Sequence, residues 1–108
     1  PTVCARRAGQ ARQLVPLGAE VGAWPPVPGS WDVLVNCTPI GGVSSPEASP
    51  LPGGPFDGRL VYDLIYRPMD TPLIRDARAA GCATLDGWPM LQAQARKQFA
   101  WWTSVVCA

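Results

Sequence analysis

The chain contains no histidine, and this absence excludes several kinds of chemistry. Without an imidazole there is no Ser–His or Cys–His pair, and the most common general base is missing. The chain has a single lysine, Lys97, which lies between Arg96 and Gln98 and reads as a solvated surface charge. The four cysteines are Cys4, Cys37, Cys82 and Cys107, and they lack the close spacing of a zinc site. No metal site is therefore expected.

Runs of charge and long apolar stretches are also lacking. Nine basic and eight acidic residues give a net charge of +1 without a block of either sign, so nucleic acid and anionic membrane surfaces are not expected partners. No apolar stretch approaches the roughly 18 to 20 residues that span a bilayer, and no targeting segment is visible at the start. Cys4, Cys37 and Cys82 lie in or beside apolar runs, which favours buried free thiols and a cytoplasmic location over two disulfides.

The length of 108 residues is enough for one hydrophobic core. The first residue is Pro1, and the sequence passes directly into the short apolar run at 2–5. We therefore expect the chain to be part of a longer protein.

Apolar runs and helical spacing alternate along the chain. Continuous apolar runs predict strands, and i, i+3, i+4 spacing with capping signals predicts helices. The strands are expected at 2–5, 31–36, 60–66 and 82–85, and the helices at 8–14, 71–80 and about 89–103. This order favours the α/β class, with an open parallel sheet and helices on both faces.

The sequence has no GxGxxG motif. In a dinucleotide-binding unit, the first strand, the glycine turn and the first helix come before the strand expected here at 2–5. We therefore expect a partial Rossmann-like sheet that lacks these three parts. The 18 residues of 41–58 contain five glycines and four prolines, and we expect them to form the most mobile internal segment.

Candidate site residues follow the predicted strands, because ligands of open parallel sheets bind beyond the carboxyl ends of the strands. Arg6 and Arg7 stand where NAD enzymes carry an acidic residue and NADP enzymes carry arginine. Two ordinary surface arginines are the alternative. Asn36 and Thr38 can bind a ribose or cap a turn. Asp63 reads as an acceptor that fixes a loop rather than as an acid catalyst.

Four ordered motifs resemble the shikimate dehydrogenase family. They are VNCTPIG at 35–41, VYDLIYRP at 61–68, TPL at 71–73 and GWPMLQAQA at 87–95. The resemblance covers nearly the whole chain. It implies the C-terminal NADP-binding domain of an enzyme of aromatic amino acid biosynthesis that reversibly reduces 3-dehydroshikimate to shikimate.

The resemblance also implies roles for individual residues. The family's usual Asn-Arg-Thr falls on Ala5, Arg6 and Arg7, so that only Arg6 matches. The family's substrate domain, with its catalytic lysine and aspartate, has no counterpart in these residues. No catalytic residue is therefore assigned here, and the chain alone is expected to be inactive. The residues implied to bind NADP are Arg6, Arg7, Asn36, Thr38, Gly87 and Met90, and those implied to bind shikimate or 3-dehydroshikimate are Tyr66 and Gln94.

Other interpretations remain open. Tyr66 can be an ordinary aromatic residue at the rim of the sheet. Met90 can be a core residue, with Gln94 exposed to solvent beside it. In these interpretations, neither position binds a ligand. For the function, the alternatives are a quinate/shikimate dehydrogenase that uses NAD and a non-catalytic fragment. The sequence leaves a homodimer open.

Overall fold

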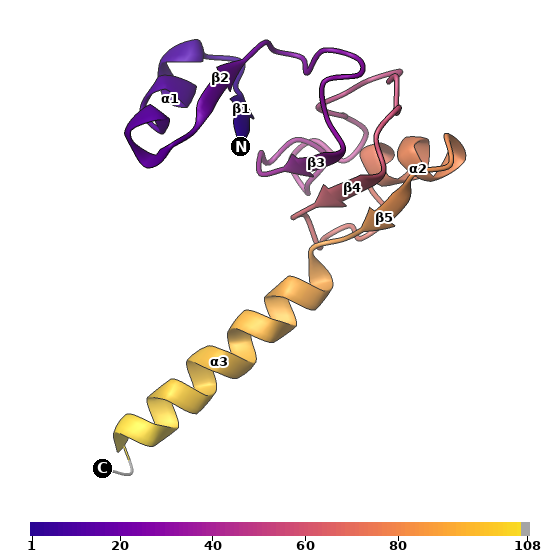
Figure 1. Cartoon of the computed structure of the whole chain (residues 1–108). Helices are drawn as coiled ribbons and strands as arrows, with labels where there is room; N and C mark the ends of the chain where they lie inside the picture. Colours follow the sequence, from indigo (N-terminus) through magenta and orange to yellow (C-terminus); the bar gives the residue numbers. More distant parts are fainter. Residues whose placement is uncertain (107–108) are drawn as a thin grey trace.

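The computed structural model describes residues 1–106, and its N-terminal part is a small βαβ unit (Figure 1). Strand β1 (Thr2–Cys4) leads to helix α1 (Ala8–Arg12), a 3₁₀ turn (Val15–Leu17) and strand β2 (Glu20–Gly22). The two strands are parallel, and the Glu20 N–H donates to the Pro1 carbonyl at 2.9 Å. The sequence did not predict β2.

The second part is a three-stranded parallel sheet in the order β3-β4-β5. Its strands are β3 (Val33–Asn36), β4 (Leu60–Asp63) and β5 (Ala83–Leu85), and helix α2 (Pro72–Ala79) connects the last two. Parallel strands and intervening helices confirm the Rossmann-like α/β class.

The parallel strands fall into two sheets. The described residues form a two-stranded and a three-stranded sheet that share no strand. The N-terminal unit and the β3-β4-β5 sheet are visibly separate in Figure 1.

Helix α2 begins and ends where its sequence predicts. The Thr71 hydroxyl accepts a hydrogen bond from the Ile74 N–H at 3.3 Å, and Pro72 occupies the first turn. Gly81, at a φ of 90°, follows the helix in the left-handed conformation that glycine adopts without strain. The helix buries Leu73 and Ala77 against the sheet.

The core consists of a small cluster under α2. Its members are Leu51, Val61, Leu73, Ala77 and Cys82, with Trp31, Leu34 and Phe56 packed against them. Leu51 and Phe56 belong to the segment 41–58, so this part of the expected mobile loop is anchored in the core. The mobility of the whole segment stays a prediction.

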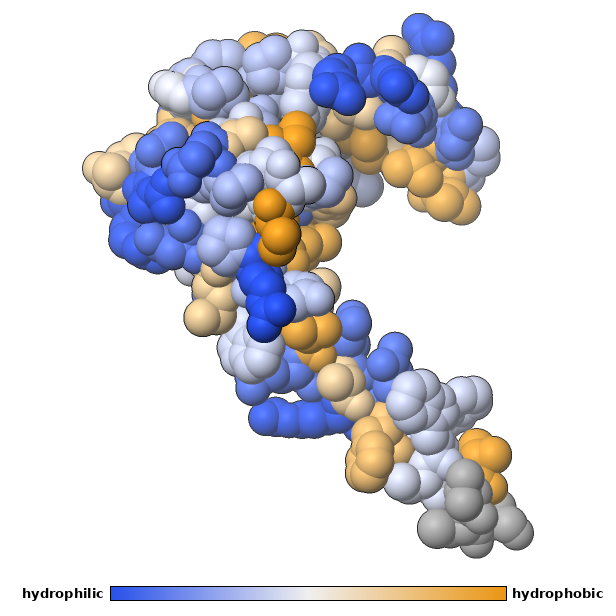
Figure 2. Space-filling model, turned by 180° about the vertical axis from the view of Figure 1, so that it is seen from behind, coloured by the Kyte–Doolittle hydropathy of each residue, from blue (hydrophilic) through white to orange (hydrophobic). Residues whose placement is uncertain are grey.

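Helix α3 (Trp88–Val106) projects away from both sheets (Figure 1). Its large apolar side chains are exposed, including Phe99 and Trp101, each at 66%, and Trp102 at 57%. Figure 2 shows that the molecule is hollowed on the side between the N-terminal unit and this helix. No helix in the described part of the chain is long and apolar enough to cross a bilayer.

Candidate functional site

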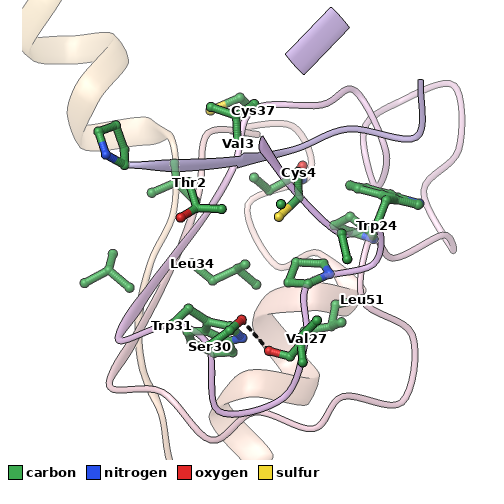
Figure 3. A pocket seen from close by; sticks show the side chains of 18 of the residues that line it. Thr2, Val3, Cys4, Trp24, Val27, Ser30, Trp31, Leu34, Cys37 and Leu51 are labelled. Atoms are coloured by element: carbon green, nitrogen blue, oxygen red, sulfur yellow. Dashed lines mark hydrogen bonds between the residues drawn. The ribbon is translucent and has the colours of Figure 1, made fainter. Parts of the chain in front are cut away.

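Two neighbouring pockets lie where β1 and β3 end. The smaller, of about 330 Å³, is lined by Cys4, Ala5, Arg6, Arg7, Gln10, Trp24, Thr38, Pro39 and Ile40. The larger, of about 530 Å³, shares Cys4, Trp24 and Thr38 with it and extends between the two strands (Figure 3). The fold therefore brings the ends of strands from both sheets to one place.

The smaller pocket has a cationic side. Arg6 and Arg7 come two and three residues after β1 and are exposed, and Thr38 lines the same pocket from the turn after β3. The two ion pairs found within residues 1–106 use Arg75 and Arg78, so neither pocket arginine is neutralised by a neighbouring carboxylate. Guanidinium groups with free donors at such a position can bind a phosphate.

Asn36 is held in a network of hydrogen bonds. It is buried, and its amide Nδ2 donates to the Ile40 carbonyl at 3.1 Å and to the Asp63 carboxylate at 3.0 Å. Its Oδ1 accepts from the Thr38 N–H at 3.0 Å and from the Thr38 hydroxyl at 2.7 Å. Two donors and two acceptor sites are thus used within the protein. Asn36 therefore orders the turn after β3.

Thr38 stays partly accessible in this turn. Its hydroxyl donates to Asn36 and accepts from the Ile40 N–H at 3.2 Å. The side chain is half-buried and lines both pockets. The network around Asn36 therefore fixes Thr38 in the lining of the pocket that also contains the arginines.

Asp63 supports the same turn from β4. It is fully buried and accepts hydrogen bonds from Asn36, from the Ile65 N–H at 3.1 Å and from the Thr71 hydroxyl at 2.7 Å. Because every bond holds a backbone turn or a helix cap, Asp63 is the structural acceptor that the sequence predicted.

Gly87 follows β5 and contacts the segment that follows β4. Its N–H donates to the Ile65 carbonyl at 3.0 Å, and a Cβ at this position would collide with the Leu64 carbonyl. Only glycine allows this close approach of two backbones. The structure thus gives Gly87 a packing role that needs no ligand.

The remaining predicted residues lie outside both pockets. Tyr66 follows β4 and is 45% exposed, while Met90 and Gln94 are exposed in the first turns of α3. The structure therefore gathers Arg6, Arg7, Asn36 and Thr38, and it leaves Tyr66, Gly87, Met90 and Gln94 at a separate place along the exits of β4 and β5.

Trp24 and Gln10 line the smaller pocket and were not predicted. Trp24 follows β2, which the sequence did not reveal, and is half-buried. Gln10 lies on α1, one turn after the arginines. The position of Trp24 just after a strand was the only sequence signal for its place in the pocket. This signal could be used only if β2 had first been predicted.

The cysteines differ from one another. Cys82 is buried, and its thiol donates to the Gly58 carbonyl at 3.3 Å, but Cys37 is exposed, so the expectation of burial is wrong there. Cys37 belongs to the turn that leaves the sheet after the buried Asn36. Cys4 is half-buried, and desolvation raises the pKa of its thiol. Cys107 lies outside the described residues.

No group of three or more histidine, cysteine or acidic residues that could hold a metal ion occurs within residues 1–106. Parallel strands with helices between them, and a cationic pocket beyond the strand ends, define an α/β protein of the Rossmann-like class.

Comparison with known proteins identifies the family. No family model matches the chain. It is 43% identical over 105 residues to the NADP(+) shikimate dehydrogenase of Aeropyrum pernix, covering 91% of this chain and 36% of that protein. It is 39% identical over 105 residues to the enzyme of the same name from an Arthrobacter species, covering 96% of this chain and 31% of the relative.

Solved structures agree with this similarity. The shikimate 5-dehydrogenase of Thermus thermophilus, in complex with NADP(H) and shikimate, matches with a TM-score of 0.79 and 34% identity over 95% of this chain and 40% of that chain. A shikimate 5-dehydrogenase-like protein matches with a TM-score of 0.81 and 28% identity over 95% of this chain and 39% of that chain. The chain belongs to the shikimate dehydrogenase family, and it spans about a third of the length of the curated relatives it matches.

Proposed function

We propose that this chain is the C-terminal, NADP-binding part of a shikimate dehydrogenase that reversibly reduces 3-dehydroshikimate to shikimate. The observation that carries the proposal is the placement of Arg6 and Arg7 in one pocket with Thr38, without acidic neighbours in the described chain. The names of the relatives and the ligands of the Thermus thermophilus structure support the choice of cofactor and substrate.

The pocket fits the 2′-phosphate that distinguishes NADP from NAD. Arg6 and Arg7 offer charged donors to the phosphate oxygens, and Trp24 gives the same pocket an aromatic wall. An acidic residue, which would accept from the free ribose hydroxyl of NAD, is absent from the lining of this pocket. These features favour NADP over the NAD-dependent quinate/shikimate alternative.

Asn36 serves the pocket indirectly. Its side-chain bonds hold Thr38 in place, so we assign the cofactor contact of this turn to Thr38 and to the backbone around it. We propose the same kind of indirect role for Gly87, which lets the chain leave β5 against β4 and begin α3 at a fixed position.

We propose that the substrate binds near the carboxyl ends of β4 and β5. Tyr66 is exposed at the end of β4, and Met90 and Gln94, four residues apart, share one face of α3. We propose that Met90 packs near the nicotinamide, while Tyr66 and Gln94 contact the substrate. The cofactor, when bound, would exchange a hydride with C3 of the substrate: the reduced form would donate it to 3-dehydroshikimate, and the oxidised form would accept it from shikimate.

We assign no proton-transfer residue to this chain. Lys97 lies on an exposed part of α3, and Asp63 is fully engaged in structural hydrogen bonds. Proton transfer to the substrate oxygen is proposed to come from residues outside these 108. We also propose a cytoplasmic location, for which the free thiols of Cys4, Cys37 and Cys82 are the support.

The test uses the complete polypeptide that carries this segment. Arg6→Ala is expected to lower kcat/KM for NADP by roughly tenfold to a hundredfold, since a hydrogen bond to a charged group contributes about 1.5–3 kcal/mol. The value for NAD should change little. Arg12→Ala is the control, because Arg12 lies at the end of α1, near Arg6 in sequence, but outside the pocket lining. Equal losses with both cofactors would contradict the assignment.

A further inference from the structure

The chain contains two Asp-Gly pairs, Asp57–Gly58 and Asp86–Gly87. In such a pair the glycine nitrogen can attack the aspartate side chain, because the glycine has no Cβ to hinder the approach. The reaction also requires a glycine N–H that is free of hydrogen bonds and an aspartate whose torsion angles can change. The structure therefore distinguishes a reactive pair from a protected one.

The first pair is open to this attack. Asp57 is exposed in the irregular segment before β4, and its carboxylate takes part in no hydrogen bond or ion pair within residues 1–106. No hydrogen bond in the same part of the chain has the Gly58 N–H as its donor. Both reacting groups are therefore available.

Gly58 is held on its carbonyl side only. Its carbonyl accepts a hydrogen bond from the Cys82 thiol at 3.3 Å, and a Cβ on Gly58 would collide with the Trp31 ring. The cyclic imide that the attack forms contains only the nitrogen of the glycine, so ring closure turns the bonds of Asp57. The contacts of Gly58 therefore leave the required rotation free.

The second pair is closed at both reacting groups. The Gly87 N–H donates to the Ile65 carbonyl at 3.0 Å. The Asp86 carboxylate accepts from the Trp88 N–H at 2.8 Å. Gly87 is also buried. Attack at this pair requires the start of α3 to open first, which lowers the rate by the equilibrium constant of that opening.

We propose that Asp57–Gly58 is a site of isoaspartate formation, and that folding protects Asp86–Gly87 from the same reaction. The Gly58 nitrogen bonds to Cγ of the protonated Asp57 side chain, and the proton of the nitrogen leaves with the hydroxyl group as water. A water molecule then opens the cyclic imide. Its attack at Cγ regenerates aspartate, and its attack at the main-chain carbonyl gives isoaspartate.

The product presents a new carboxylate at an accessible position. Isoaspartate adds one carbon to the main chain before Gly58 and leaves the former main-chain carboxyl as the side group. This group is the substrate of protein isoaspartyl methyltransferases, which move a methyl group to it from S-adenosylmethionine and release S-adenosylhomocysteine. Pro55 and Arg59 on either side are exposed as well, so an enzyme of this class can reach the segment.

The site is separate from the proposed cofactor site. Neither Asp57 nor Gly58 lines the two pockets. The reaction needs only water, so it depends on neither cofactor nor substrate.

The test is incubation of the folded chain at neutral pH and physiological temperature, followed by digestion and mass spectrometry with electron-transfer fragmentation, which distinguishes isoaspartate from aspartate. We expect isoaspartate to accumulate roughly tenfold or more faster at Asp57 than at Asp86. In urea both N–H groups are free, and the two rates should become similar. Similar rates in the folded chain, or a difference that persists in urea, would overturn the proposal.

Asp57→Asn and Asp86→Asn are a matched pair of variants. Asparagine closes the same imide with loss of ammonia instead of water, and its side-chain oxygen can still accept from the Trp88 N–H at the second site. Circular dichroism checks that both variants fold. Asp57→Asn should deamidate roughly tenfold or more faster than Asp86→Asn, because only the second reaction needs α3 to open. Equal deamidation in the folded variants would contradict the proposed difference.

Asp57→Glu is the negative control, because a glutamate side chain must close a larger imide ring, which forms far more slowly. The incubated parent chain should accept a labelled methyl group from S-adenosylmethionine in the presence of isoaspartyl methyltransferase, and Asp57→Glu should lose this labelling. Labelling that persists in Asp57→Glu would place the isoaspartate elsewhere and overturn the proposal. Failure of the cofactor proposal would leave all these results unchanged.

Discussion

The Asn36 amide donates to the Asp63 carboxylate at 3.0 Å inside the protein, and this bond joins the ends of β3 and β4. The two residues are 27 positions apart in sequence. Asp63 also holds the Thr71 hydroxyl, which caps α2. One buried carboxylate therefore fixes two strand ends and a helix start, and with them the turn that carries Thr38 to the pocket.

Asp63→Ala should destabilise the chain by about 3 kcal/mol, because it leaves the buried donors of Asn36 and Thr71 without an acceptor. Urea unfolding followed by circular dichroism measures the change. Asp57→Ala is the control at an exposed carboxylate and should lie within about 0.5 kcal/mol of the parent. A loss below about 1 kcal/mol at Asp63 would show that the network contributes little.

Thr71→Ala should cost about 2 kcal/mol, since it removes both the cap of α2 and a donor to Asp63. Thr71→Ser keeps the hydroxyl and should recover most of this loss. Both values come from the same urea experiment. If the serine variant were as unstable as the alanine variant, packing of the Thr71 methyl group rather than its hydroxyl would explain the effect.

The fold class could be predicted from the sequence because the strong signals are local. The apolar run before Asn36 and the Thr-Pro start at 71–72 both indicate their elements without reference to the rest of the chain. Strand β2 gives no such signal, since Glu20–Gly22 has one large apolar residue. It forms by pairing with β1, which only the folded chain reveals.

The site was predicted less completely for a related reason. Asn36 and Thr38 stand at the right strand end, but the use of Asn36 depends on Asp63 in a distant segment. Cys37 follows an apolar run and is nevertheless exposed, because the chain turns away from the sheet after Asn36. Contacts between distant segments decide both outcomes.

Cys4 should be alkylated more slowly than Cys37 at neutral pH. Burial raises the pKa of the Cys4 thiol, so less thiolate is present and its rate should rise only at more alkaline pH. Iodoacetamide labelling followed by peptide mass spectrometry gives the rates. Cys82 is buried and should react most slowly.

The unfolded chain in urea serves as the control for this order, because all the thiols should then react at similar rates. If Cys4 and Cys37 had the same pH dependence in the folded chain, the half-buried position of Cys4 would not govern its reactivity.

Gln94→Ala, in the complete polypeptide that carries this segment, should lower kcat/KM for shikimate by roughly tenfold, which is the loss of one hydrogen bond to the substrate. The Tm should stay near the parent value because Gln94 is exposed on α3. Gln92→Ala on another face of the helix is the control for steady-state kinetics. A lower Tm with unchanged kinetics would make Gln94 a structural residue.

Binding of adenosine 2′,5′-bisphosphate to the 108-residue chain, compared with adenosine 5′-monophosphate by calorimetry, tests most directly whether the pocket of Arg6 and Arg7 recognises the 2′-phosphate. We expect the bisphosphate to bind at least tenfold more tightly, and Arg6→Ala to abolish this difference while Arg12→Ala preserves it. Equal affinities for the two nucleotides, or a difference that persists in Arg6→Ala, would contradict the assignment of an NADP site.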